Sequence, residues 1–260
     1  MMEKYFGKLS GNMFLLVFIV VITTISVFSM FQPVYVNIPF NVILPILVLV
    51  TMKMVFFERL KLTTLVLMRI LVVLAAINIF DGPLYVKIVL IFLVINILEA
   101  TYTDFKVKKY FNVATGIALA VTVPLITGTW LVDYYTATTA CVVGILCWII
   151  AYTIWNFIFV TNEFSESIAK LHVGILLAPL LSIVLLANPG YWLIIRANSL
   201  TIGGVIQIAN KPFMEKKLVS ARFSKFVNFT KQNNIQIYLM VFNLVLIAVM
   251  VVLHFMKVGG

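Results

Sequence analysis

Four side chains that could do chemistry lie at similar depths inside long apolar segments: Arg69, Glu99, Asn156 and His172. At 1.5 Å per residue, Arg69 and Glu99 lie about 8–12 Å below the same end of two predicted antiparallel helices, so an ion pair between them is available. An arginine can bind an anion, a glutamate can take up a proton, and a histidine titrates near neutral pH. These residues predict a polar pocket that faces the cytoplasm. The alternative is a buried Arg–Glu pair that only holds helices together, beside a His172 that is merely hydrogen-bonded.

Asn96 extends this group along one side of a helix. Asn96, Glu99 and Thr103 follow one another at intervals of three and four residues, which brings them onto the same helical face. Polar side chains within a membrane usually face the interior of the bundle or a wet cavity. We therefore expect Asn96 and Glu99 to face the same pocket.

A second polar face lies on the segment 190–210. Polar and small residues recur there at helical spacing, with Asn198 beside them: Arg196, Ser199, Gly203, Gln207 and Asn210. This face could line a permeation path with Arg196 as a fixed positive charge in its outer half. Small residues equally allow helices to pack closely and to form interhelical hydrogen bonds. We assign the glycines to packing and keep Arg196, Asn198, Ser199 and Gln207 as candidate site residues.

Motifs for the common catalytic and cofactor sites are absent from the sequence. The two histidines, His172 and His254, do not form a zinc-binding His-Glu-x-x-His motif, and no nucleophile elbow or phosphate-binding Walker loop occurs. Cys141 and Cys147 are six residues apart and point to different faces of one helix, which favours packing over a metal pair. We expect no catalytic residue, no metal and no cofactor.

The composition indicates a membrane protein. Hydrophobic residues make up 63% of the chain and charged residues 11%, whereas soluble domains average about 45–50% and about 25%. The net charge of +10 is typical of lysines and arginines retained on the cytoplasmic side of a membrane protein, so we expect no nucleic-acid partner.

Nine apolar segments are long enough to cross about 30 Å of hydrocarbon as helices. They cover residues 12–31, 36–57, 62–80, 83–103, 110–132, 137–160, 165–187, 190–210 and 235–256. With the N-terminus in the cytoplasm, 15 of the 19 lysines and arginines fall on the cytoplasmic side, as the positive-inside rule requires. The sequence therefore predicts an all-α, polytopic integral membrane bundle of about nine transmembrane helices with a cytoplasmic N-terminus.

One membrane-embedded domain, 1–260, accounts for the whole chain because no connection is long enough for a soluble domain. The longest connection, 211–234, mixes six lysines and arginines with phenylalanines. As an amphipathic helix it would lie on the inner leaflet and bind anionic lipids. As a solvated loop it would only keep positive charge inside.

Function remains open between three hypotheses at this stage. The first is a transporter- or channel-like protein for a small polar or anionic solute, which Glu99 and His172 could couple to protons. The second is a membrane-embedded enzyme acting on a lipid-linked or lipophilic substrate at the inner leaflet, with Glu99 and His172 as acid and base. The third is a non-catalytic receptor, sensor or assembly subunit. In each case we expect the protein in a bacterial inner (plasma) membrane.

Overall fold

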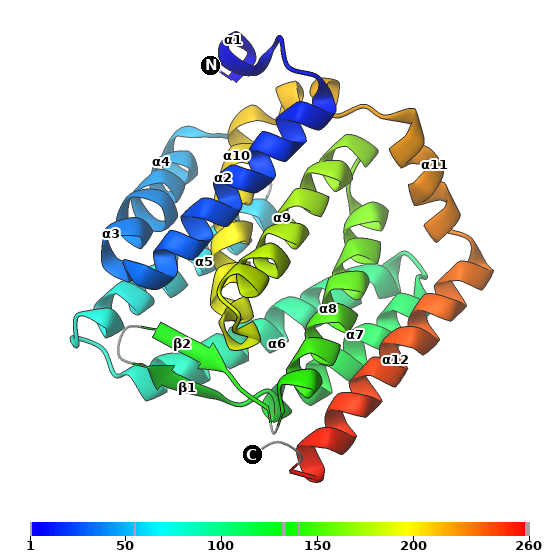
Figure 1. Cartoon of the computed structure of the whole chain (residues 1–260). Coiled ribbons are helices and arrows are strands. Elements are labelled where there is room, and N and C mark those ends of the chain that lie inside the picture. The colour runs from blue at the N-terminus through cyan, green and yellow to red at the C-terminus, as the bar shows by residue number, and fades with distance from the viewer. Residues whose placement is uncertain (1, 55, 132–133, 140, 258–260) are drawn as a thin grey trace.

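The computed structural model describes residues 2–54, 56–131, 134–139 and 141–257, and Figure 1 shows a bundle of helices with one short hairpin. The first half contains α1 (Met2–Phe6), α2 (Gly11–Phe31), α3 (Pro33–Asn37), η1 (Ile38–Ile43), α4 (Leu44–Thr51), α5 (Phe56–Ala76), α6 (Gly82–Lys106), α7 (Tyr110–Thr122) and η2 (Val123–Leu125). The second half contains β1 (Gly128–Leu131), β2 (Tyr134–Ala137), α8 (Val142–Glu163), α9 (Glu166–Leu185), η3 (Pro189–Tyr191), α10 (Trp192–Lys217), α11 (Ala221–Thr230) and α12 (Asn233–Phe255).

Seven helical segments of the described chain are long and apolar enough to cross a membrane. They are α2, the continuous α3–η1–α4 segment, α6, α8, α9, η3 with α10, and α12. Two of the nine predicted spans fall outside this set. The span 62–80 corresponds to α5, which carries Glu58, Arg59, Lys61 and Arg69, and the span 110–132 corresponds to the shorter α7–η2 segment. The chain is therefore a multi-pass helical membrane protein.

Apolar side chains on the outside of the bundle support this conclusion. Leu16 and Val20 of α2 are more than half exposed, as are Tyr238 and Val245 of α12. Such continuous apolar faces are unfavourable in water and match the acyl chains of a bilayer. The helices thus present one apolar face to lipid and another to the protein core.

Prolines in the second span are accommodated within a helix. Pro39 lies in η1, a π-helical turn that joins α3 to α4. Such turns shift the hydrogen-bond ladder by one residue, which relieves the bond that proline cannot make. Asn41 in this turn is buried and donates a 3.1 Å hydrogen bond from Nδ2 to Oδ1 of Asn37.

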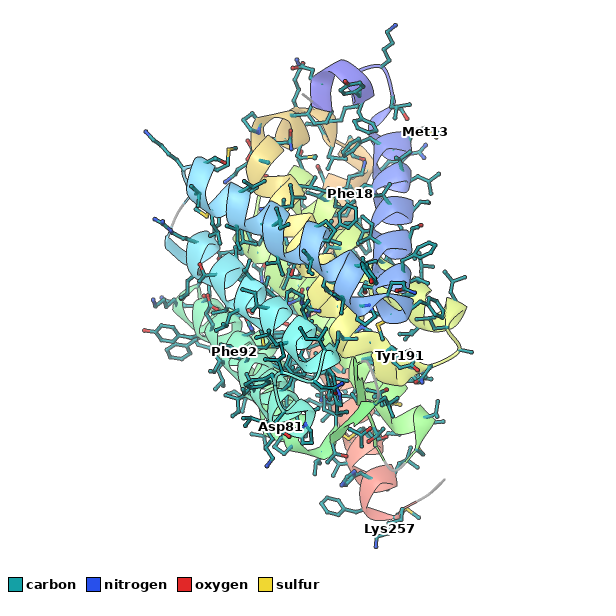
Figure 2. All side chains as sticks on the ribbon, turned by 90° about the vertical axis from the view of Figure 1, so that its left-hand side faces the viewer. Met13, Phe18, Asp81, Phe92, Tyr191 and Lys257 are labelled. Carbon is teal, nitrogen blue, oxygen red and sulfur yellow. The ribbon has the colours of Figure 1, made fainter. Side chains whose placement is uncertain are left out.

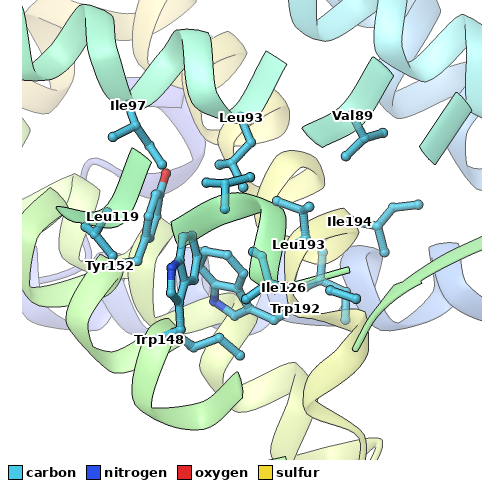
Figure 3. Packing of buried hydrophobic residues seen from close by; sticks show 14 of the residues in the cluster. Val89, Leu93, Ile97, Leu119, Ile126, Trp148, Tyr152, Trp192, Leu193 and Ile194 are labelled. Atoms are coloured by element: carbon cyan, nitrogen blue, oxygen red, sulfur yellow. The ribbon is translucent and has the colours of Figure 1, made fainter. Parts of the chain in front are cut away.

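Two apolar cores organise the bundle. One joins α2, α9 and α10 around Phe14, Phe18 and Ile175. The larger core joins α6, α7, α8 and the start of α10, and it contains a cluster of aromatic rings in which Trp192 packs edge-on against Trp148 and Tyr152 at 5.9 and 4.9 Å (Figure 3). These cores fix α6, α8 and α10, which form three walls of the cavity described below.

A β-hairpin closes one end of the bundle, and the all-α prediction did not include it. β1 and β2 pair antiparallel, with Trp130 opposite Tyr135. Aromatic and β-branched residues dominate both strands, which favours strand over helix. Trp130 packs edge-on against Tyr85 of α6 at 5.4 Å and covers Gly82. The predicted spans 110–132 and 137–160 therefore overrun into the hairpin.

The two ends of the bundle differ in character. Figure 1 shows α1 and α11 at one end, and the hairpin and the last turn of α12 at the other. Met13 lies towards the first end, and Asp81 and Lys257 lie at the second (Figure 2). Within 211–234, the structure has a helix, α11, in place of a loop.

Candidate functional site

A cavity of about 150 Å³ lies inside the bundle between α5, α6, α8 and α10. His172 of α9 and Tyr135 of the hairpin complete its wall. Six of the nine predicted site residues line this cavity: Arg69, Asn96, Asn156, His172, Arg196 and Gln207. Members of both predicted polar groups thus meet in one place, whereas Glu99, Asn198 and Ser199 do not line the cavity.

Arg69 is held by a chain of hydrogen bonds that crosses three helices. Its side chain is 1% exposed, and Nη1 donates to Oδ1 of Asn198 on α10 at 2.6 Å. Asn198 donates in turn from Nδ2 to the Ser29 hydroxyl on α2, which donates to the carbonyl of Ser26 at 2.6 Å. Asn198 thus lies behind the cavity wall and orients the guanidinium.

The partner of Arg69 differs from the predicted one. The sequence paired Arg69 with Glu99, whereas Glu99 is half-buried on α6 and interacts electrostatically with Lys61. The reason is depth: α5 begins at Phe56, six residues before the predicted span, so Arg69 lies about 20 Å along the helix from its start. This depth brings Arg69 level with Asn198 on α10.

Arg196 reaches the same cavity from α10. Its side chain is 4% exposed, and Nη2 donates to Oδ1 of Asn156 on α8 at 3.2 Å. The Tyr152 hydroxyl lies next to the guanidinium. Both buried arginines thus have neutral side chains, Asn198, Asn156 and Tyr152, as hydrogen-bond partners, which leave their positive charge in place.

His172 lies near Arg196 and Lys61, with which it interacts electrostatically. Its Nε2 is 2.8 Å from Oε1 of Gln207, and its ring stacks on Phe164 with 5.0 Å between centroids. The described residues that line the cavity include three cationic side chains, Lys61, Arg69 and Arg196, and one carboxylate, Glu58, so the cavity is basic. An anion is the ligand that such a field attracts.

Several buried polar atoms around the cavity have no hydrogen-bond partner among the described residues. They are Nε of Arg69, Nε and Nη1 of Arg196, Nδ1 of His172 and the hydroxyl of Tyr135. Burial raises the pKa of Tyr135, so its hydroxyl stays protonated at physiological pH and can donate. Unpartnered buried donors are costly in a folded protein, and in native structures they commonly mark a site for a ligand or an ion.

Two other predicted polar residues serve the bundle's own structure. Ser199 donates from its hydroxyl to the carbonyl of Ile175 on α9 at 3.1 Å and to that of Arg196 at 2.9 Å. Thr103 of the predicted α6 stripe bonds the carbonyl of Glu99 in its own helix at 3.1 Å. These residues join or stabilise helices, and neither lines the cavity.

Three tyrosines of the cavity were missed from the sequence: Tyr85, Tyr135 and Tyr152. Tyr152 lies four residues before Asn156, an interval that brings both onto one face of α8 and could have signalled it. Tyr135 could not be found in this way, because it reaches the cavity from a hairpin whose position depends on Trp130 packing against α6.

Among the described residues, no group of three or more His, Cys, Asp or Glu side chains is arranged to hold a metal ion. Cys141 instead caps α8, where its Sγ accepts a hydrogen bond from the backbone nitrogen of Gly144 at 3.2 Å. The chain matches no protein-family model, no curated protein and no solved structure.

Proposed function

We propose that this chain is a transporter- or channel-like membrane protein that binds a small anionic solute between Arg69 and Arg196. The observation that carries the proposal is the presence of two buried guanidinium groups in one cavity, whose hydrogen bonds go to the neutral side chains of Asn198 and Asn156. Each ionised side chain in hydrocarbon costs roughly 2.5–3.5 kcal/mol on insertion scales. A bound anion would offset this cost and would satisfy the unpartnered donors.

Proton coupling is part of this proposal. His172 lines the same cavity and contacts Gln207 of α10, the helix that also carries Arg196. A proton on His172 would add positive charge beside the anion, so uptake of the two would be mutually favourable. Glu99, which interacts with Lys61, is the second proton-active group in this proposal.

The membrane arrangement we propose has about nine crossings, a cytoplasmic N-terminus and a bacterial inner membrane as its location. The α5 and α7–η2 segments would supply the two crossings beyond the seven long apolar segments. The positive-inside rule supports this orientation, because α11 and the last turn of α10 at the α1 end carry Lys216, Lys217, Arg222 and Lys225.

Anionic lipid at the cytoplasmic face is the partner we propose for α11. Arg222, Lys225, Phe226 and Phe229 are exposed on this helix, whereas Val227 is buried against the bundle. Cationic and aromatic side chains on one exposed helix suit the headgroup region of an anionic leaflet.

A charge reversal tests the lipid contact. Anionic phosphatidylglycerol should raise the unfolding temperature of the wild-type protein, and the double change Arg222→Glu with Lys225→Glu should remove most of this gain. Lys87→Glu is the matched control, because Lys87 is also exposed but lies on α6 near the hairpin end. Equal losses in both variants would exclude a specific role for α11.

Anion binding tests the proposed function. Purified protein in nanodiscs of neutral lipid would be unfolded by heat in chloride-free buffer, with chloride, phosphate, acetate or benzoate added. A bound anion at 100 times its Kd should stabilise the protein by about 2.7 kcal/mol. Arg69→Gln and Arg196→Gln should lose this stabilisation.

Arg59→Gln is the control for this experiment, because Arg59 is exposed on the same helix as Arg69. Flux of the stabilising anion into proteoliposomes would then separate transport from binding alone. Variants at Arg69 and Arg196 that respond to every anion as the wild type does would overturn the proposal.

A further inference from the structure

The cavity has an extensive apolar wall that a small inorganic anion would not use. Val89 and Leu93 of α6 face Leu193 and Ile194 of α10 in Figure 3, and Phe159 of α8 also lines the cavity. All five side chains are less than 10% exposed. A ligand gains roughly fourfold in affinity for each methylene group that it buries against such a wall.

The volume of the cavity limits the size of the apolar group. Its roughly 150 Å³ matches an engineered apolar cavity of about 150 Å³ that holds one benzene molecule. A long acyl chain needs a much larger space. The apolar body of the ligand therefore has about six carbon atoms.

The charge of the cavity limits what else the ligand can carry. The hydrogen bonds of Arg69 and Arg196 go to neutral side chains. Against one carboxylate, Glu58, the described lining has three cationic side chains, Lys61, Arg69 and Arg196. An ammonium group on the ligand would be repelled by these side chains and would lose its own hydration on entry. The field therefore selects against zwitterions such as amino acids.

We infer that the solute is a small organic monoanion: a carboxylate held by Arg69 and Arg196, joined to an apolar body of about six carbons. This inference rests on the proposed function and names its substrate class. Planar carboxylates match the forked donors of arginine, and the Tyr135 hydroxyl supplies a further donor from the hairpin. The apolar body then lies between α6, α8 and α10.

A ligand series on the wild-type protein tests the inference. Titration calorimetry in nanodiscs of neutral lipid would compare acetate, hexanoate, benzoate, hexanamide, 6-aminohexanoate and dodecanoate. Hexanoate should bind about 250-fold more tightly than acetate, since it buries four more methylene groups. Benzoate should resemble hexanoate. Hexanamide and 6-aminohexanoate, which lack the net charge, should each bind at least tenfold more weakly, and dodecanoate should bind no better than hexanoate.

A variant that changes size without changing charge gives a second test. Gly204 lines the cavity, and a Cβ atom placed there would meet no atom within 4 Å. Gly204→Leu should therefore fill part of the cavity, weaken hexanoate at least tenfold and leave acetate almost unchanged.

The outcomes separate this inference from the proposal on which it rests. Equal affinity for acetate, chloride and hexanoate, lost in Arg196→Gln, would overturn the organic-anion inference and leave the anion-binding proposal standing. Binding of none of these ligands would overturn both. Tighter binding of hexanamide than of hexanoate would also overturn both, because it would make the arginines irrelevant to recognition.

Discussion

Asn198 sets the orientation of the buried Arg69 side chain. The amide accepts from the guanidinium on one side and donates to the Ser29 hydroxyl on the other, so it connects α5, α10 and α2. Because an amide is neutral, it orients Arg69 without cancelling its charge. A carboxylate at the same position would orient Arg69 and would also neutralise its charge.

Substitutions at Asn198 separate these two effects. Asn198→Ala should destabilise the protein by about 1–3 kcal/mol, since Arg69 and Ser29 both lose a buried partner. Asn198→Asp should restore most of the stability but abolish anion binding, because its carboxylate would neutralise Arg69. Thermal unfolding and calorimetry measure the two properties, with the exposed Asn234→Ala as control. An Asn198→Asp protein that still binds anions would contradict this role.

For single residues, the sequence predicted which side chains are unusual better than it predicted which residues they contact. Apolar surroundings identified Arg69, Arg196 and His172 as unusual, because charged side chains in hydrocarbon are rare. The Arg69–Asn198 pair could not be predicted. It depends on where α5 starts and on how α5 and α10 are placed along their lengths, and neither quantity is encoded in local spacing.

Among the elements, α10 has two roles on two faces. Gly203 faces α9, where an added Cβ atom would lie 2.5 Å from Cγ1 of the fully buried Ile175. Gly204 faces the cavity and has open space around it. We expected both glycines to serve helix packing, whereas only Gly203 lies close to a neighbouring helix.

The neighbouring glycines provide a matched pair of substitutions. Gly203→Ala should destabilise the protein by about 1–3 kcal/mol through overpacking. Gly204→Ala should be neutral or stabilise by about 0.5–1 kcal/mol, since alanine favours a helix interior over glycine. Both free energies can be measured by unfolding in a denaturing detergent. The same cost at the two positions would mean that α9 and α10 are not packed as described.

The sequence largely predicted which helices exist, but it did not predict where they begin and end. All nine apolar windows contain a helix, because a long apolar segment must satisfy its backbone within itself in a bilayer. The hairpin at 128–137 escaped because two strands of four residues carry too little periodicity to stand out between apolar helices.

For the whole molecule, the proposed orientation places the two termini on opposite sides of the membrane. α1 and the C-terminal turn lie at opposite ends of the bundle (Figure 1). After replacement of Cys141 and Cys147 by serine, a cysteine at Lys8 should react with an impermeant reagent only from the cytoplasmic side. A cysteine at Lys257 should react only from the other side. Labelling of both from one side would require an even number of crossings.

The short α7–η2 segment has a consequence for the bilayer itself. Its 13 α-helical and three 3₁₀-helical residues extend about 25 Å, less than the roughly 30 Å of a hydrocarbon core. Ile117 and Val121 on α7 are exposed. In the nine-crossing arrangement that we propose, they would face lipid, and the acyl chains beside them would have to shorten.

This hydrophobic mismatch predicts that the transport we propose depends on membrane thickness. Solute flux should be highest in bilayers of short-chain lipids. It should fall in thicker bilayers, because the lipid must thin more to match the length of α7, which costs more free energy. Proteoliposomes made from phosphatidylcholines with acyl chains of increasing length would measure this dependence. A flux that does not depend on the acyl-chain length of the lipid would mean that α7 is shielded from lipid. In the proposed nine-crossing arrangement, the protein would carry a local thinning of the membrane with it, and the hydrocarbon layer would be thinner beside α7 than elsewhere in the same bilayer.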